Sequence, residues 1–306
     1  MFKFLIRRTL YAIPVILTVI TITFFIVRII PGGPFDMERE VPSEVKVALN
    51  SYYGFDKPLI VQYFNYVNNM LHGNFGPSYK YTDWDVTELV MTKAPISFEL
   101  ACYGLLIATT FGILFGSISA IYSYTKIDIF FSSLSSLCVC LPTFVLGPIL
   151  AYIFAIKLHM FSVSGWSDFS NKFLPSVTLG TIYTAYISKL SKDSILAAMN
   201  RPYVITARAK GLSKLRIFFI HVLRNGLQPV IAFLGPAFAS LISGAIVIET
   251  VFNIPGIGRL FINAISNRDD TLILGIVNFY ALLIILFNTL ADVVQVWLNP
   301  RQKLSL

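Results

Sequence analysis

Several windows of about 20 residues in this chain carry almost no charge, and that is the length a helix needs to cross the hydrocarbon core of a bilayer. The chain has 306 residues, of which 56% are hydrophobic and only 13% are charged. Soluble domains carry roughly 25% charged residues on average. The sequence therefore predicts an all-α polytopic membrane protein rather than a soluble domain.

Six segments are predicted to span the membrane. The third contains Pro142 and Pro148, and a kinked helix is the simplest interpretation of it. The fourth is the least apolar, and its hydroxyl groups serve either helix packing or an aqueous pathway, with Thr181, Thr184 and Tyr186 as pathway candidates. The predicted spans are Leu10–Ile30, Ile96–Tyr122, Ile129–Ile156, Phe173–Leu190, Val230–Ile248 and Leu272–Leu298.

The charges between these segments predict the topology. Residues 189–228, the basic loop, contain eight basic residues against one acid, Asp193, which places the loop in the cytoplasm under the positive-inside rule. Residues 31–93 contain eight acids against five basic residues, which suits the outer side. Both termini are then cytoplasmic. The net charge of +8 reflects asymmetry across a bilayer, and we expect no nucleic-acid binding.

The N-terminal apolar run is expected to be retained as the first span. It extends from Thr9 to Ile30, which exceeds the length of a typical signal-peptide core, and no small-residue cleavage site follows it. In the outer segment, residues 43–53 are expected to form a helix that stops at Gly54. Residues 58–71 have the apolar spacing of an amphipathic helix that rests on the membrane surface or on neighbouring helices.

The basic loop has the pattern of two helices separated by a glycine. Pro202 suits the first turn of a helix, and Gly211 suits the left-handed position that ends it. Ser213 can cap a second helix over residues 214–226. The small side chains of Ala207 and Ala209 would allow close approach by another surface.

The basic charge of the loop has two interpretations. Arg208 and Lys210 can pair with acids on a soluble protein partner, or they can bind anionic lipid headgroups only. The ordered helix–glycine–helix pattern favours protein docking. The three cysteines, Cys102, Cys138 and Cys140, lie in apolar segments without metal or disulfide spacing, so we expect them to pack as small apolar residues.

Four stretches of this sequence resemble a known family of transport proteins. They are the opening Arg7-Arg8, Ile13-Pro14 and Pro31 to Pro34, then His72-Gly-Asn-Phe-Gly-Pro-Ser-Tyr-Lys-Tyr81, then Thr206-Ala-Arg-Ala-Lys-Gly-Leu212 with His221-Val-Leu-Arg-Asn-Gly-Leu-Gln-Pro229, and finally Glu249-Thr-Val-Phe-Asn-Ile-Pro-Gly-Ile-Gly258 with Asn267-Arg-Asp269. Together they resemble the permeases of binding-protein-dependent ABC importers, in particular the B subunit of the oligopeptide branch. The family often has Arg where Ile205 stands.

The resemblance implies a type I ABC importer permease fold with six transmembrane helices in the bacterial inner membrane. It implies four kinds of partner besides membrane lipid: a homologous second permease, two ATP-binding subunits, an extracytoplasmic peptide-binding protein and the peptide substrate. It assigns ATPase coupling to Tyr203, Thr206, Ala207, Arg208, Ala209, Lys210, Gly211 and Leu212. Thr250, Pro255, Gly256 and Gly258 predict a tight re-entrant or outer-surface turn. With Glu249 they are outer-loop or gate candidates that guide cargo or contact the binding protein, or else the turn is purely structural.

Four divisions of the chain follow from these expectations. Residues 1–30 form the first span, and residues 31–93 form an extracytoplasmic segment. Residues 94–293 form the core permease domain with the coupling loop at 189–228. Residues 294–306 complete the last helix and form a cytoplasmic tail.

The sequence contains no phosphate-binding loop, metal signature or hydrolase elbow, so no catalytic, cofactor or metal site is expected. The middle of every predicted span is uncharged, which disfavours an ion-coupled secondary transporter. A scaffold or receptor that moves nothing is a third class, disfavoured by the polar fourth span. The nearest alternatives within the family are dipeptide and nickel importer permeases.

Overall fold

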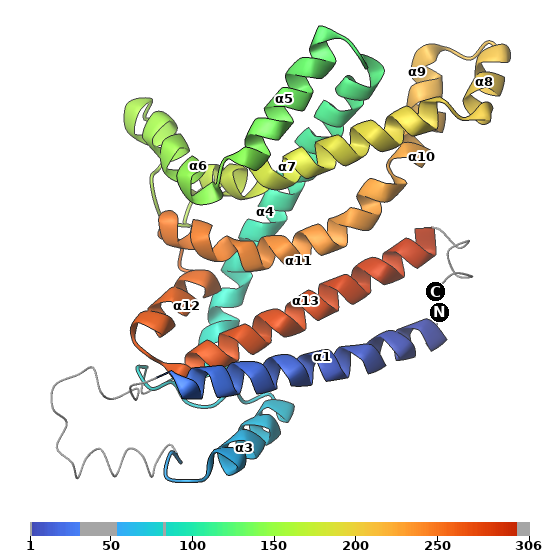
Figure 1. The fold of residues 1–306 in the computed structure, drawn as a ribbon. Coiled ribbons are helices and arrows are strands. Elements are labelled where there is room, and N and C mark those ends of the chain that lie inside the picture. The colour runs from blue at the N-terminus through green and yellow to red at the C-terminus, as the bar shows by residue number, and fades with distance from the viewer. Residues whose placement is uncertain (1, 31–53, 82–83, 299–306) are drawn as a thin grey trace. The chain divides into compact units, whose positions relative to one another are not determined.

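The computed structural model describes residues 2–30, 54–81 and 84–298 (Figure 1). In these ranges every regular element is a helix, and one isolated β-bridge joins Pro77 to Asp85. The helix expected at 43–53, the turn at 31–34 and the tail from residue 299 onward lie outside the described residues. The helices form two compact units.

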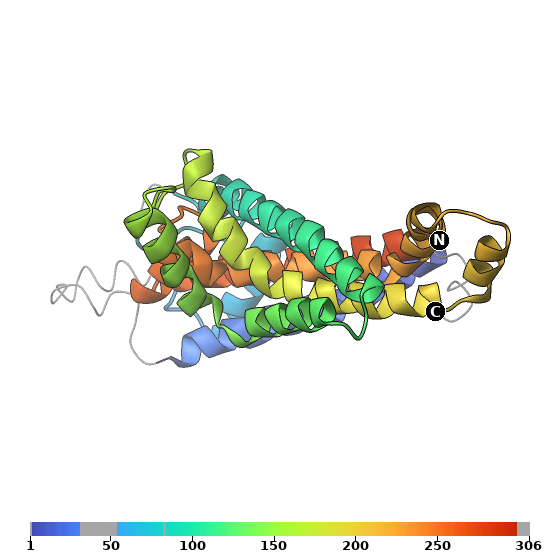
Figure 2. The same ribbon diagram turned by 90° about the horizontal axis from the view of Figure 1, so that it is seen from above.

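The first unit comprises Ser97–Ile254 and Leu286–Leu306, and its central helix is α7 (Phe169–Met199). This helix lies against α5, α6 and α11 along most of its length. Figure 2 shows α5 beside α7, with α8 and α9 extending beyond the end of α7. The other helices with residues in this unit are α4 (Val86–Ile121), α5 (Lys126–Cys140), α6 (Thr143–Leu150), the π-helix η1 (Ala151–Lys157), α8 (Pro202–Ala209), α9 (Lys214–Arg216), the π-helix η2 (Ile217–Leu223), α10 (Arg224–Gly226), α11 (Gln228–Val251) and the end of α13 (Asp270–Leu298).

Small residues at every fourth position of α4 allow α7 to approach closely. Gly112 and Gly116 are buried there, and a Cβ at Gly116 would lie 2.4 Å from the carbonyl oxygen of Ser188. From the other helix, a Cβ at Gly180 would lie 2.6 Å from the carbonyl oxygen of Gly104. Membrane helices associate through such contacts because lipid offers no hydrophobic driving force between them.

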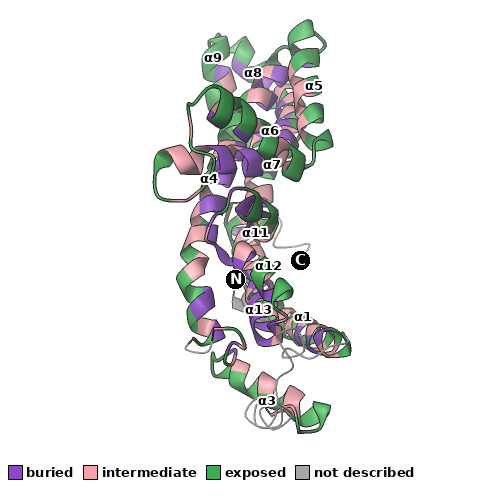
Figure 3. Ribbon diagram, turned by 90° about the vertical axis from the view of Figure 1, so that its left-hand side faces the viewer, coloured by how far each residue is buried: buried purple, intermediate pink, exposed green. Residues whose placement is uncertain are grey.

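The second unit comprises Phe2–Ile96 and Pro255–Ile285. It contains α1 (Phe2–Ile29), α3 (Leu59–Leu71), α12 (Ile257–Ser266), the start of α4 and the start of α13. Tyr63 and Tyr66 of α3 pack on Phe24 of α1 with ring centroids 5.5 and 5.9 Å apart. No residue of α3 is fully buried, and Figure 3 colours it exposed or intermediate along its length. The amphipathic helix predicted over residues 58–71 is confirmed.

Four of the predicted spans coincide with helices that are long and apolar enough to cross a membrane, namely Leu10–Ile29, Val86–Ile121, Gln228–Val251 and Asp270–Val296. The second of these begins ten residues before the span predicted from Ile96. The predicted fourth span lies within α7, a continuous helix of 31 residues that is less apolar than the others.

The predicted third span is broken rather than kinked. Lys126–Cys140 and Thr143–Lys157 meet at an angle of 106°, so the pair forms either a broken span or a re-entrant loop. Leu141 is extended, with φ −87° and ψ 115°, because Pro142 disfavours helical geometry in the residue before it. The structure therefore has a break with a sharp bend at Pro142 in place of the kinked but continuous helix that was predicted.

Candidate coupling surface and translocation site

The first half of the basic loop ends in the glycine stop that its sequence predicts. Pro202 occupies the first turn of α8, and Gly211 has a φ of +77°. The Gly211 amide donates to the Arg208 carbonyl at 2.9 Å, and the Leu212 amide donates to the Ala207 carbonyl at 3.3 Å. These two bonds form the Schellman motif, which satisfies carbonyls left open at a helix end.

The second half begins at the predicted cap. The Ser213 hydroxyl accepts from the Arg216 amide at 3.4 Å, and the helix continues through α9, η2 and α10 to Gly226. Its central seven residues are π-helical, a feature that the sequence did not indicate. At its end, a Cβ on Gly226 would lie 3.0 Å from Cγ1 of Ile195 on α7, so glycine permits the second half to pack tightly against that helix.

A buried apolar cluster holds the loop to the helix ends. Val204 and Ala207 of α8 pack with Ile217 and Val222 of η2 and with Ile195 of α7. Leu212 is partly buried against the same cluster, which is the hydrophobic contact that commonly accompanies a glycine helix stop. Ala207 is thus covered by its own chain and does not face outward, which differs from its expected role in close approach by another surface.

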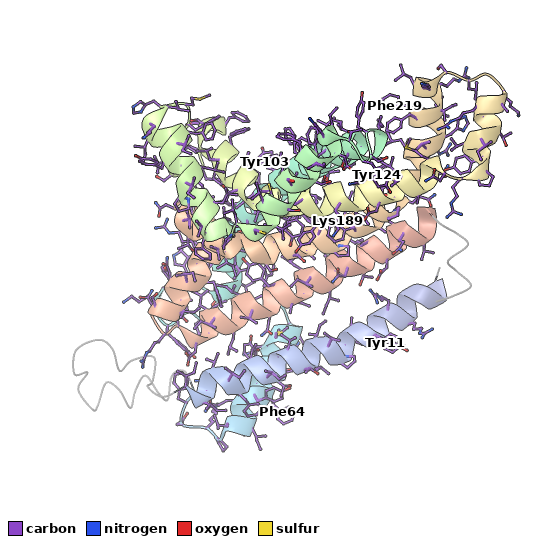
Figure 4. The ribbon with its side chains drawn as sticks, turned by 45° about the horizontal axis from the view of Figure 1, so that its top comes forward. Tyr11, Phe64, Tyr103, Tyr124, Lys189 and Phe219 are labelled. Carbon is purple, nitrogen blue, oxygen red and sulfur yellow. The ribbon has the colours of Figure 1, made fainter. Side chains whose placement is uncertain are left out.

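The outward face of the loop combines basic and apolar side chains. Tyr203, Thr206, Arg208, Ala209 and Lys210 are exposed. Four apolar residues that were not among the coupling candidates are exposed as well: Ile205, Leu215, Phe219 and Ile220, which are 64%, 72%, 60% and 50% exposed. Phe219 is labelled on the second half of the loop in Figure 4. Exposed apolar side chains among basic ones are typical of a protein docking surface. The sequence feature that could have indicated this surface is the presence of apolar residues within the basic segment.

A cavity of about 1010 Å³ lies at the base of the loop. Arg201 and Tyr203 line it at the start of α8, Gln228 lines it from α11, and Gln295 lines it from α13. A residue of the coupling surface, Tyr203, therefore shares a cavity with two membrane-length helices, so a movement of α8 would change the shape of this cavity.

An ion-pair network ties α5 to α7 near the C-terminal end of α7. Asp128 is buried and accepts from the Ser119 hydroxyl, the Tyr124 amide, the Ser132 hydroxyl and the Lys192 ammonium. The Lys192 ammonium also donates to the Ser132 hydroxyl at 3.1 Å. A buried charge with this many partners fixes the spacing of the two helices.

A second network lies at the N-terminal end of α7. The Glu99 carboxylate of α4 accepts from the Lys172 ammonium at 2.7 Å, from the Trp166 indole at 2.9 Å and from the Tyr103 hydroxyl at 2.9 Å. The Gly165 amide donates to the Phe252 carbonyl at 3.2 Å, so the same loop also reaches the end of α11. Charged residues at the two ends of α7 therefore bind it to its neighbours.

The turn after α11 forms differently from the sequence interpretation. Thr250, Pro255, Gly256 and Gly258 predict a tight turn, but the residue with left-handed backbone is Asn253, with a φ of +56°. The Ile254 amide donates to the Glu249 carbonyl at 2.8 Å, and the Asn253 amide donates to the Thr250 carbonyl at 3.3 Å, which is again a Schellman motif. Glu249 is fully buried, and Thr250 is exposed.

The remaining outer-loop candidates lead into α12. Pro255 precedes Gly256, which is the N-cap residue of α12 and has an extended backbone with φ −94° and ψ −173°. Gly258 is buried in the first turn of this helix. Neither glycine needs left-handed geometry at these positions. The described residues contain no group of three or more His, Cys, Asp or Glu side chains placed to hold a metal.

In the second unit, Asp269 fixes the His72–Tyr81 stretch. It is 1% exposed, and its Oδ2 accepts from the Ser78 hydroxyl and from the amides of Tyr79 at 3.2 Å and Lys80 at 3.3 Å. Its Oδ1 accepts from the Leu272 amide at 3.1 Å. Two of the sequence stretches that carry the family resemblance are thus joined by a single carboxylate.

Burial shifts the pKa of two tyrosines, Tyr79 within this stretch and Tyr66 on α3. Burial raises the pKa of Tyr66 to about 12, although the Asn278 amide donates to its oxygen at 2.8 Å and opposes the shift. Burial also raises the pKa of Tyr79, while the nearby Arg28 guanidinium opposes that shift. Arg28 lies 3.8 Å from the Asp270 carboxylate and stacks on Phe55 at 4.5 Å. Both phenols therefore stay protonated and act as packing groups.

The three pathway candidates of α7 differ in their surroundings. Thr184 is buried, and its hydroxyl donates to the Gly180 carbonyl at 2.9 Å. Thr181 is partly buried, and its hydroxyl donates to the Val177 carbonyl at 2.6 Å. Tyr186 is 49% exposed and lines a cavity of about 400 Å³ between α5 and α7. Of the three, only Tyr186 lines this cavity.

Solved structures with a similar fold come from ABC transporters. An amino acid ABC transporter crystallised with histidines aligns with a TM-score of 0.55 at 15% identity, covering 68% of this chain and 94% of that chain. An inward-facing MetNI methionine ABC transporter aligns with a TM-score of 0.57 at 12% identity, covering 69% and 96%. The predicted fold class, an all-α membrane protein with the type I importer permease fold, is confirmed, and the helices are consistent with six spans.

Sequence comparison gives the family. The oligopeptide transport system permease protein OppB of Escherichia coli (strain K12) is 40% identical over 98% of this chain and 99% of that protein. The dipeptide transport system permease protein DppB of Bacillus subtilis (strain 168) is 36% identical over 99% of each.

Residues 1–101 match the family "Binding-prot-dependent transport system membrane comp, N-term", and residues 112–304 match the family "Binding-protein-dependent transport system inner membrane component". Together the two matches cover nearly the whole chain. This chain therefore belongs to the family of binding-protein-dependent transport system inner membrane components.

Proposed function

We propose that this permease carries oligopeptides into the cytoplasm as one half of the membrane pore of an ATP-driven importer. The observation that carries the proposal is the basic loop. Its inner face is fixed by a buried cluster, and its outer face offers Arg208 and Lys210 beside the exposed Ile205. A rigid element of this kind can transmit the movement of a soluble motor into α7 and α11.

The partners follow from this assignment. A homologous second permease would complete the pore, two ATP-binding subunits would dock on the basic loop, and an extracytoplasmic binding protein would deliver the peptide. The chain itself would not hydrolyse ATP. It would lie in the bacterial inner membrane with both termini in the cytoplasm, because the basic loop and the basic residues near the N-terminus belong on that side.

The candidate residues come from three parts of the chain: the coupling loop, the outer loop and α7. Tyr203, Thr206, Arg208, Ala209 and Lys210 would contact the motor, while Ala207, Gly211 and Leu212 would hold the loop in shape. The stretch of Glu249, Thr250, Pro255, Gly256 and Gly258 would form the outer gate or the docking site of the binding protein. Tyr186 would line the pathway, and the hydroxyls of Thr181 and Thr184 would serve helix packing.

The proposed divisions of the chain keep the bounds given above. Residues 1–30 would anchor the N-terminus, and residues 31–93 would lie outside the membrane. Residues 94–293 would form the permease core with its coupling loop at 189–228. Residues 294–306 would end in the cytoplasm.

Transport in proteoliposomes tests the proposal. The complete complex should accumulate labelled tetraalanine only when ATP and the binding protein are present. Competition with di-, tri- and pentaalanine measures the length preference and separates oligopeptide from dipeptide transport, which the likeness to DppB makes the second candidate. Uptake that persists without the ATPase but stops with a protonophore would instead indicate an ion-coupled carrier.

A further inference from the structure

A polar groove runs between α5 and α7. This hydroxyl groove has a volume of about 400 Å³ and is lined by the hydroxyls of Ser119, Ser132, Ser135, Ser136, Tyr186 and Ser188. A second hollow of about 600 Å³ continues it along α5 and shares Ser132, Ser136, Cys140 and Lys192 with it. Of these residues, the sequence indicated hydroxyl groups at Tyr186 and Ser188 of the fourth span, with Tyr186 as a pathway candidate.

The groove is unsuited to face lipid. Ser132, Ser136 and Cys140 stand four residues apart, so they share one face of α5. Across the groove, Lys189 and Asp193 are exposed on α7, and Lys189 is labelled in Figure 4. Both residues belong to the basic loop that is predicted to lie in the cytoplasm, so this end of the groove opens to water and not to lipid.

The walls of the groove are fixed. Asp128, Lys192 and Ser132 bind α5 to α7 along one edge, and the Ser135 hydroxyl donates to the Ser188 hydroxyl at 3.1 Å across the floor. The Ser136 hydroxyl donates to the Ser132 carbonyl at 2.9 Å, which leaves its oxygen lone pairs facing the groove as acceptors. The hydroxyls therefore stand at set positions instead of collapsing onto one another.

We propose that the hydroxyl groove is the part of the passage wall that contacts the main chain of the peptide in transit. The Ser132 and Ser136 hydroxyls donate their protons within the protein, so their oxygens can accept from peptide N–H groups whatever the side chains are, and the Tyr186 hydroxyl can donate to peptide C=O groups. Lys189 and Asp193 offer opposite charges to the carboxylate and ammonium ends of the peptide. The inference rests on the proposed function and names the residues that meet its substrate.

The natural cysteine of the groove provides the test. Cys140 is exposed and lines both hollows, whereas Cys102 and Cys138 line neither. In the reconstituted complex, a Cys102→Ser/Cys138→Ser variant keeps Cys140 as the one thiol of this chain. Cys140 should react with a membrane-impermeant maleimide added in water, and tetraalanine should slow that reaction several-fold during ATP-driven uptake.

Other results would overturn the inference. If tetraalanine is taken up but Cys140 reacts only with a lipid-permeable maleimide, or reacts at the same rate with and without the peptide, then the passage lies elsewhere and the proposed function stands. If the unmodified complex takes up no peptide with ATP, the proposed function fails and this inference fails with it.

A pair of substitutions gives a second measurement. Ser136→Val removes a hydroxyl that lines the groove. Thr109→Val, on α4, removes a hydroxyl that lines neither hollow. The two are matched because each hydroxyl donates to the carbonyl four residues before it. Ser136→Val should lower tetraalanine uptake several-fold, and Thr109→Val should leave it unchanged. Equal uptake by the two variants would contradict the inference. If Ser136→Val does not fold, the labelling of Cys140 still tests the inference.

Discussion

At the scale of single residues, backbone conformation decides where the helices of this chain end. Gly73, Gly211, Asn253 and Arg268 all have positive φ values, and each follows a helix whose last carbonyls accept from the next two amides. Glycine adopts this conformation without cost, whereas other residues need support from the surrounding structure. The helix ends at Gly73 and Gly211 are therefore determined by the local sequence. The helix ends at Asn253 and Arg268 depend also on the surrounding structure.

A substitution at Gly211 should act through the backbone conformation alone. Nothing lies within 4 Å of the position that a Cβ would take, so Gly211→Ala causes no clash but must hold a left-handed backbone, at a cost of about 1–2 kcal/mol. We expect this variant to lower peptide uptake per ATP hydrolysed while the protein still inserts. Gly211→Asn is the matched control, because asparagine tolerates this conformation. Equal coupling in both variants would show that the glycine stop has no part in coupling.

Asp269 should be essential to the second unit. Asp269→Asn removes the charge that holds the Ser78 hydroxyl and three backbone amides, and we expect it to cost about 1–3 kcal/mol. The measurement is thermal unfolding combined with limited proteolysis of residues 72–85. Asp168→Asn is the control, since Asp168 is exposed and accepts one hydroxyl, from Ser167. Similar protease resistance in both variants would argue against a role for Asp269 in fixing this stretch.

At the scale of helices, the first unit depends on close approach and on charge. Buried small residues occupy every fourth position of α4 from Gly104 to Ala120, which brings the backbone of α7 into contact with it. The networks around Asp128 and Glu99 then fix α7 at its two ends. As a result α7, the least apolar of the long helices, is held by glycine packing and ion pairs in place of a wide apolar face.

Gly116→Ala tests the close approach. The added methyl group would lie 2.4 Å from a backbone oxygen of α7, so the two helices must separate, and we expect a loss of about 1–3 kcal/mol. Gly244→Ala on α11 is the matched control, because nothing lies within 4 Å of its Cβ position and alanine favours a helix by up to about 1 kcal/mol. Thermal unfolding of the purified chain measures both. Equal midpoints for the two variants would contradict tight packing between α4 and α7.

At the scale of the whole molecule, the position of the basic loop separates the proposed docking surface for the ATP-binding subunits from the membrane-spanning helices. The basic loop gathers eight of the 24 lysines and arginines of the chain within residues 189–228. Its helices α8 and α9 extend beyond the end of α7 (Figure 2), and a buried apolar cluster joins the loop to Ile195 of α7. A motor docked on the loop would therefore act on the permease core through a rigid connection.

Charge reversal tests this arrangement. Arg208→Glu/Lys210→Glu should weaken copurification of the ATP-binding subunits on the order of tenfold at low salt, and high salt should reduce the binding of the wild-type chain in the same direction. Lys126→Glu/Arg224→Glu is the control with an equal change of charge, and both of its positions are exposed outside α8. Equal losses in the two variants would indicate general electrostatic attraction instead of docking on α8.

The sequence by itself determined the helical membrane class, the position of the basic loop and the order Pro202, Gly211, Ser213 within it. These features depend on hydropathy and on interactions between residues a few positions apart, so they can be read from a short window. The resemblance of four stretches to importer permeases also gave the family before any contact was known.

Only the tertiary structure decided the rest. Pro142 predicts an interruption, but the 106° bend depends on what packs against α5 and α6. Thr184 and Tyr186 read alike in the sequence, yet one is buried and the other lines the hydroxyl groove. Ser78 meets Asp269 across 191 positions of the chain. Such features arise from contacts between distant segments, whose geometry is set by packing and not by local sequence.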